Sequence, residues 1–88
     1  MCRSIQTLYN FTPPATDDEV HAAALQFVRK LSGYRTPSRA NQAAFERAVE
    51  DIARASRALL DELVTDAPPR DRALVAERAR AASARRFG

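Results

Sequence analysis

The sequence predicts an all-α protein with three helices, and three observations carry this prediction. Eighteen of the 88 residues are Ala and Arg is also common, whereas Gly occurs twice and runs of β-branched residues are missing. Apolar side chains recur at the three- and four-residue spacing of helices that bury one face. Pro-containing breaks and cap residues separate three such segments, which we expect at residues 17–32, 39–64 and 67–85. Residues 1–88 are expected to form a single domain.

The longest segment, residues 39–64, is the helix against which the other elements should pack. Its apolar stripe consists of Phe45, Ala48, Val49, Ile52, Ser56, Leu59, Leu60 and Leu63. The opposite face is charged and should lie in solvent, with ion pairs four residues apart expected between Glu50 and Arg54, Arg47 and Asp51, and Arg57 and Asp61. The Ser56 hydroxyl can donate to the carbonyl four residues earlier, so we interpret it as a satisfied core serine.

The segment at residues 17–32 begins and ends with clear helix signals. Thr16 and Glu19 have the spacing of a capping box, and Gly33 supplies a C-terminal stop. Because the connection to the next helix is short, the two helices should form an antiparallel hairpin. His21 lies at the flank of the apolar stripe, where we expect a surface residue.

The segments at both ends of the chain have weaker patterns. Residues 1–15 should form an extended segment packed across the hairpin, with at most one helical turn around Ile5 to Tyr9. The third helix should start near Ala67 with Asp66 as its cap and the two prolines in its first turn. Its large apolar residues are few, so it should dock lightly, pack against another subunit or fray.

Basic charge is concentrated in the C-terminal third. Residues 1–69 carry a net charge of −1 and residues 70–88 a net charge of +4. Sequence-independent nucleic-acid binding through the third helix is therefore one functional alternative, using Arg70, Arg72, Arg78, Arg80, Arg85 and Arg86. These arginines do not share one face and no aromatic residues lie between them, so a solubilising helix or one that binds an acidic protein surface explains the pattern as well.

Cys2 is the residue whose chemistry leads the functional interpretation. With the initiator Met removed, its α-amine and thiolate could chelate a metal ion, capture a small electrophile or carry a persulfide, and Arg3 would favour the thiolate. The leading hypothesis is a non-enzymatic binding or interaction module with a site at Cys2 and Arg3, bordered by Asn10 and Phe11, and with a metal ion as its candidate cofactor. The alternative for Cys2 is an inert, buried sulfur. An enzyme ranks third, because no paired acid and base groups are evident.

The chain also resembles a small bacterial family of uncharacterised proteins, domain of unknown function 2277. The resemblance rests on Met1 to Ile5, Leu8, Asn10-Phe11, Pro13 to Thr16, Val28 to Gly33, Pro37-Ser38, Asn41, Phe45 and Ala48-Val49. It implies a compact helical cytosolic protein with no established activity, and it supports a role for Cys2 because the family pattern begins at Met-Cys-Arg.

Partners and location follow from hydrophobicity and size. No apolar run approaches the length of a membrane span, and no apolar signal region or disulfide pair is present, so we expect a cytoplasmic protein without a membrane partner. The core available to 88 residues with so many Ala is thin, so a homo-oligomer formed through helix faces is expected.

Overall fold

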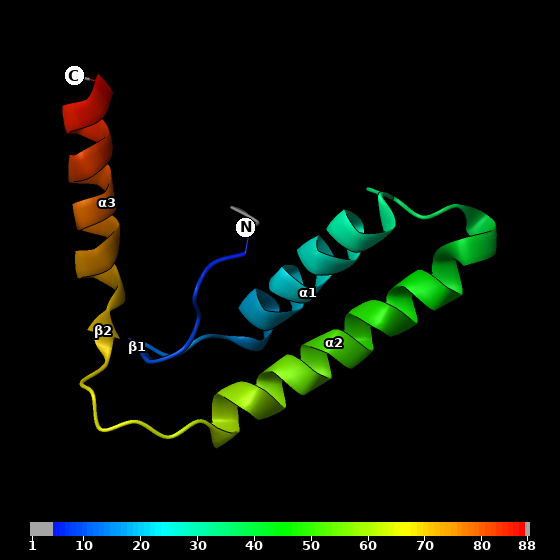
Figure 1. Ribbon diagram of the computed structural model, residues 1–88, viewed down its shortest axis with the longest axis horizontal. Coiled ribbons are helices and arrows are strands. Elements are labelled where there is room, and N and C mark those ends of the chain that lie inside the picture. The colour runs from blue at the N-terminus through cyan, green and yellow to red at the C-terminus, as the bar shows by residue number, and fades with distance from the viewer. Residues whose placement is uncertain (1–4, 88) are drawn as a thin grey trace.

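The computed structural model describes the backbone of residues 5–87 and the side chains of residues 5–82. Helices α1 (Asp17–Ser32) and α2 (Gln42–Glu62) lie antiparallel as a hairpin, and α3 (Arg72–Phe87) projects away from it (Figure 1). The two-residue strands β1 (Phe11–Thr12) and β2 (Arg70–Asp71) pair in parallel and join the N-terminal segment to the start of α3. The molecule is mostly helical, as the sequence predicts, but this small sheet departs from a purely all-α fold.

Helix α1 is defined by its two caps. The Thr16 hydroxyl accepts from the Glu19 amide at 3.2 Å, and a Glu19 carboxylate oxygen accepts from the Thr16 amide at 3.0 Å, which completes the predicted capping box. Gly33 ends the helix with φ of +78° and donates its amide to the Arg29 carbonyl at 2.9 Å. Gly suits this left-handed position because it has no Cβ.

The hairpin core is small. Val20, Ala24 and Val28 of α1 and Val49 of α2 are its buried side chains. Phe45, Ile52 and other half-buried residues of α2 pack against Ala24, Val28 and Val49. The predicted stripes therefore face each other, although their outer members Leu31 and Leu59 remain 75% and 56% exposed.

Helix α2 differs from its prediction in its ends and its surface contacts. A single turn of 3-10 helix, η1 (Arg39–Asn41), precedes the α-helix, which ends at Glu62 and not at 64. The Ser56 hydroxyl donates to the Ile52 carbonyl at 2.7 Å, as expected. Of the expected ion pairs, Arg57 and Asp61 are joined at 3.0 Å, whereas Arg54 contacts Asp51 at 3.4 Å.

The prediction for the start of α3 was wrong. Residues 63–69 form an extended connection that contains both prolines, and α3 begins at Arg72. Asp71 provides the cap, since its carboxylate accepts from the Leu74 amide at 2.9 Å. Asp66 does not serve as the cap because strand β2 lies between Asp66 and the first residue of α3.

The projection of α3 gives the molecule an open shape. Its dimensions are 45 × 37 × 19 Å and its radius of gyration is 15.9 Å. A compact domain of this length would have a radius of gyration of about 12 Å. No helix in the described part of the chain combines the length and apolar character needed to cross a bilayer.

Candidate functional site

The N-terminal segment is held in place by the connection that precedes α3. Asn10 occupies the left-handed region at φ of 64°, a conformation that Asn tolerates better than most residues. Its side-chain amide lies 3.4 Å from the Ala67 carbonyl and 3.3 Å from the Pro68 carbonyl, and its own carbonyl accepts from the Arg70 amide at 2.8 Å. These contacts fix the turn at Asn10, and residues 5–10 form no helical turn, which was the most that the sequence predicted around Ile5 to Tyr9.

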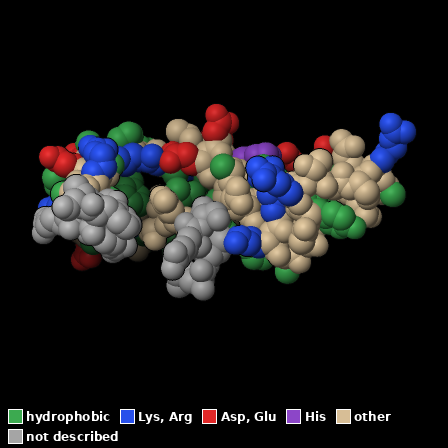
Figure 2. All heavy atoms as spheres, turned by 90° about the horizontal axis from the view of Figure 1, so that it is seen from above, with side chains coloured by type: hydrophobic (Ala, Val, Ile, Leu, Met, Phe, Trp, Pro, Cys, Tyr) green, Lys and Arg blue, Asp and Glu red, His purple; other side chains and the backbone are tan. Residues whose placement is uncertain are grey.

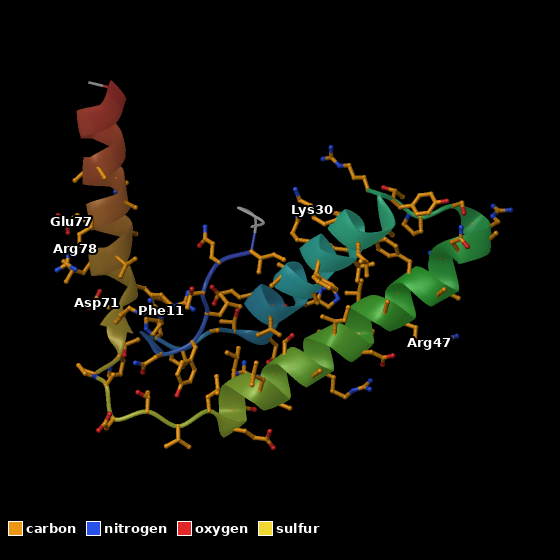
Figure 3. The ribbon with its side chains drawn as sticks, in the orientation of Figure 1. Phe11, Lys30, Arg47, Asp71, Glu77 and Arg78 are labelled. Atoms are coloured by element: carbon orange, nitrogen blue, oxygen red, sulfur yellow. The ribbon has the colours of Figure 1, made fainter. Side chains whose placement is uncertain are left out.

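The ring of Phe11 contacts two arginine side chains, that of Arg70 on the neighbouring strand β2 and that of Arg72 at the start of α3. The guanidinium carbon of Arg70 lies 4.3 Å from the centre of the ring and that of Arg72 lies 5.8 Å from it. Arg70 also donates to the Tyr9 carbonyl at 2.8 Å. Figure 3 shows Phe11 beside β2. We call Asn10, Phe11, Arg70 and Arg72 the N-terminal anchor.

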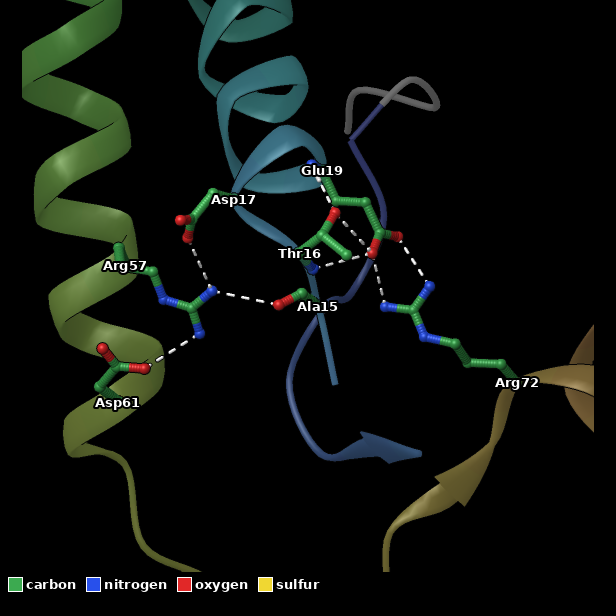
Figure 4. Close-up of polar contacts among 7 residues, drawn as sticks. All are labelled: Ala15, Thr16, Asp17, Glu19, Arg57, Asp61 and Arg72. Carbon is green, nitrogen blue, oxygen red and sulfur yellow. Dashed lines mark hydrogen bonds and ion pairs between the residues drawn. The ribbon is translucent and has the colours of Figure 1, made fainter. Parts of the chain in front are cut away.

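Arg72 connects the anchor to α1. Its guanidinium forms a bidentate contact with Glu19, at 2.8 and 2.9 Å (Figure 4). Its Nε also donates to the Pro13 carbonyl at 2.6 Å. The hydrogen bonds from Arg72 are the main reason that the pKa of Glu19 falls from 4.5 to about 2, and the Thr16 amide adds to this effect. The same contact raises the pKa of Arg72. One carboxylate therefore caps α1 and also holds α3.

Arg57 makes the corresponding link from α2. It donates to the Ala15 carbonyl at 3.1 Å and lies 3.5 Å from Asp17, in addition to its pair with Asp61 (Figure 4). The prediction that Arg57 belongs to a solvated face was wrong for this residue, whose side chain is 33% exposed. It sits where α2 passes the start of α1, so its side chain can reach across.

A groove of about 510 Å³ lies between the N-terminal segment and α3. Gln6, Thr7 and Leu8 line one side and Val75, Ala76 and Ala79 line the other. Glu19, Arg72 and Arg80 add charged groups to its wall. Because Glu19 already pairs with Arg72, Arg80 is the cation that the described residues leave without an ion pair in this groove.

The structure brings only some of the predicted site residues together. Asn10 and Phe11 lie together in the anchor, while Cys2 and Arg3 lie outside the described residues. Among the arginines proposed for nucleic acid, Arg70 and Arg72 are engaged within the chain, and Arg85 and Arg86 lie outside the described side chains. Arg78 and Arg80 are exposed, and Figure 3 shows Arg78 on the side of α3 that faces away from the hairpin.

The sequence did not predict that Asn10 and Phe11 would contact Arg70 and Arg72. Arg72 and Glu19 are 53 residues apart, and no local spacing pairs them. The usable signal was the presence of Phe11 and of two arginines within three residues after Pro69, since an arginine and an aromatic ring can form a cation–π contact.

A second hollow lies beside the hairpin near the connection from α1 to α2, and its described residues form no metal-binding set. It has a volume of about 610 Å³ and is lined by His21, Phe45 and Glu50 among others. His21 is half exposed and lies 3.7 Å from Glu50, in agreement with the expected surface position. Within the described residues, no group of three or more His, Cys, Asp or Glu side chains is placed to hold a metal ion.

In this chain a helical hairpin carries an anchored N-terminal segment and a projecting third helix. A family model for DUF2277, described as an uncharacterized conserved protein, matches residues 1–78. The chain therefore belongs to this family, which confirms the resemblance found in the sequence. No curated protein and no solved structure matches the chain.

Proposed function

We propose that this protein is a small, non-enzymatic binding module whose site is built around the N-terminal segment. Cys2 supplies the reactive group in this proposal, a thiolate that binds a metal ion, carries sulfur or captures a small electrophile, and Arg3 favours that form. Asn10 and Phe11 serve as the support that holds the segment.

The observation that carries the proposal is the N-terminal anchor. A segment without a site could remain loosely attached, yet here Asn10 and Phe11 are held by groups more than 50 residues away. Ordering these residues costs conformational entropy, which the contacts of Arg70 and Arg72 must offset. We take the ordering of Asn10 and Phe11 as support for a site in the N-terminal segment.

The size and lining of the groove beside α3 favour a small molecule as the ligand. Its volume of about 510 Å³ falls within the range of about 300–1,000 Å³ that is typical of small-molecule sites. Its α3 side is apolar at Val75, Ala76 and Ala79, and Arg80 supplies a positive charge. This combination suits a small ligand with an apolar part and an anionic group.

Thiol reactivity tests the proposal directly. Iodoacetamide alkylation of the full chain is measured from pH 6 to 10 and compared with a peptide of residues 1–12, which keeps Arg3 but lacks α3. We expect the full chain to react with a lower apparent thiol pKa than the peptide, and Arg80→Gln to reduce this difference. Arg78→Gln is the matched control because the same charge is removed from the outward side of α3. Identical pH profiles for chain and peptide would end the proposal.

Intact mass spectrometry identifies what the thiol carries. Protein purified without reductant or chelator should show added mass from sulfur or another covalent group in wild type, and none in Cys2→Ser. A metal ion is read under native conditions in the same pair. An unmodified, metal-free Cys2 in freshly purified protein contradicts this part of the proposal.

The projecting α3 favours nucleic-acid association as a second candidate, because Arg78 and Arg80 extend into solvent. Fluorescence anisotropy with a 20-base-pair duplex should give an affinity that falls steeply with salt. Replacing both arginines by Gln should lower the salt slope by about 2. The control replaces Arg47 and Arg54 of α2 in the same way. Absence of binding at low salt would rule this candidate out.

A further inference from the structure

Positive charge also gathers at the end of α1 that lies away from the N-terminal anchor. A hollow of about 530 Å³ there, which we call the basic hollow, is lined by Gln26, Arg29, Lys30, Gly33 and Arg35. None of these five residues carries a carboxylate. Arg29, Lys30 and Arg35 form no ion pair with any acidic residue in the described part of the chain. Three positive charges therefore surround one hollow without a negative charge in its wall.

The helical repeat and the turn after α1 bring these residues together. Arg29 and Lys30 follow Gln26 by three and four residues, which places all three on one face of the helix. Gly33 ends the helix in the left-handed conformation, so that Arg35 returns beside this face. Figure 3 shows Lys30 on the side of α1 that faces away from α2. Figure 2 looks down on this side of the molecule and shows Lys and Arg side chains near the middle of the face.

Arg29 is the cation whose orientation is fixed by the chain itself. It is half-buried, and its Nε donates to the Arg35 carbonyl at 3.0 Å. This contact uses one of the five N–H groups of the guanidinium and leaves those of its two terminal nitrogens for another partner. A guanidinium can donate two parallel hydrogen bonds to a phosphate. Because Arg29 is already held, it loses less conformational freedom when it binds an anion.

The dipole of α1 explains only part of this arrangement. Cations in the last turn of a helix are favoured by its negative end, which accounts for Arg29 and Lys30. Arg35 lies beyond the helix, yet its charge is added to the same hollow. The negative end of a helix is equivalent to about half a unit charge, so the three cations outweigh it. The carbonyls of Arg29 and Arg35, which could repel an anion, already accept hydrogen bonds.

We propose that the basic hollow binds the phosphoryl group of a small molecule. A phosphate monoester carries a charge of about −1.5 to −2 at neutral pH, which the three cations can neutralise. The volume of about 530 Å³ lies within the range of about 300–1,000 Å³ that is typical of small-molecule sites. It leaves room for the group that bears the phosphate. Gly33 has no side chain, and the space beside its Cα is open, so a ligand can approach the backbone there.

This site is separate from the N-terminal site. Glu19 joins the anchor to the first turn of α1, whereas Gly33 lies about 20 Å further along at 1.5 Å per residue. A small molecule is favoured over a nucleic acid because a bound single strand uses aromatic stacking, and none of the five lining residues is aromatic. Phosphate binding at this end of α1 does not require a reactive Cys2, so each proposal can fail without the other.

Nuclear magnetic resonance of the full chain labelled with nitrogen-15 tests the proposal. Inorganic phosphate and AMP are the probes, each titrated at constant ionic strength. We expect both probes to shift the signals of the Gly33 amide and the Arg29 Nε–H until they saturate. Arg29→Gln should weaken binding about tenfold, as read from the Gly33 amide, because charge-assisted hydrogen bonds are lost. Arg47→Gln is the matched control and should leave the affinity unchanged, since Figure 3 shows Arg47 on the side of α2 that faces away from α1.

Arg35→Gln keeps the test decisive if Arg29→Gln disturbs the end of α1. The substitution removes a charge but retains the backbone carbonyl that holds Arg29, so binding should weaken several-fold while the Arg29 Nε–H signal stays in place. Equal affinities for phosphate and AMP support recognition of the phosphoryl group alone, and tighter binding of AMP supports a phosphorylated molecule as the ligand.

Three results overturn the proposal. Shifts that never saturate, or equal weakening by Arg35→Gln and Arg47→Gln, mean that phosphate responds only to the net charge of the chain. Shifts of the same signals by a 20-base-pair duplex, with no response to phosphate or AMP, assign this face to nucleic acid instead.

Discussion

Replacement of Val49 by Ala tests whether the small hairpin core stabilises the whole molecule. Val49 is 4% exposed and packs against Ala24 and Val28, so the substitution removes two buried carbons from the centre of the hairpin. The lost transfer free energy is about 1.6 kcal/mol at ~0.8 kcal/mol per carbon. The residual cavity raises the expected loss to about 2 kcal/mol.

Thermal unfolding followed by circular dichroism measures this loss. For a domain of this size, 1 kcal/mol lowers the melting temperature by about 4–8 °C, so Val49→Ala should melt about 8–16 °C below wild type. Val64→Ala is the matched control, because the same two carbons are removed from a side chain that is 94% exposed. All samples share one protein concentration, since a dimer would make the melting temperature depend on it. Equal melting temperatures for the two variants would refute the reasoning.

Three further predictions concern the contacts that hold the ends of the helices. The stabilising effect of Glu19 is the difference in unfolding free energy between wild type and Glu19→Gln. It should be complete above pH 4.5 and disappear as the pH falls towards the folded pKa of about 2, because the depressed pKa reflects contacts made only by the folded carboxylate. Urea titrations from pH 2 to 7 measure this difference, and a difference that does not change with pH would contradict the prediction. Gly33→Ala should lower the unfolding free energy by about 1 kcal/mol in urea titration, because φ of +78° strains any residue with a Cβ even though open space surrounds the site; unchanged stability would argue against the left-handed cap. Asp71→Ala should reduce the helical signal in circular dichroism by uncapping the Leu74 amide, with a cost of about 1 kcal/mol, while Asp71→Asn should retain most of it; equal losses would show that the cap has no role.

The hairpin was predictable because the signals that define it are short in range. Thr16 and Glu19 cap α1 within one turn, and Gly33 stops it, so residues 17–32 were identified without knowledge of the rest of the fold. The buried stripe of Val20, Ala24 and Val28 follows from the helical repeat. These interactions involve neighbours in the chain, and their closure entropy is small.

The start of α3 was not predictable from the same signals. Two residues, Asp66 and Asp71, could each cap a helix, and the prolines allowed either interpretation. Asp71 was selected because pairing of Phe11 with Arg70 holds the chain in an extended conformation up to that point. A contact 59 residues away in sequence, between Arg72 and Pro13, reinforces this choice.

The sequence by itself determined the helical class, the hairpin of α1 and α2, the cap of α1 and the concentration of basic charge in α3. Tertiary structure alone decided that Arg70 and Arg72 hold Phe11 and Glu19, and that Phe27, Leu31 and Leu59 remain 44%, 75% and 56% exposed. The physical reason is the path of the chain. A helix face is set by the order of neighbouring residues, whereas a contact across more than 50 residues forms only if the intervening turns bring the two side chains together.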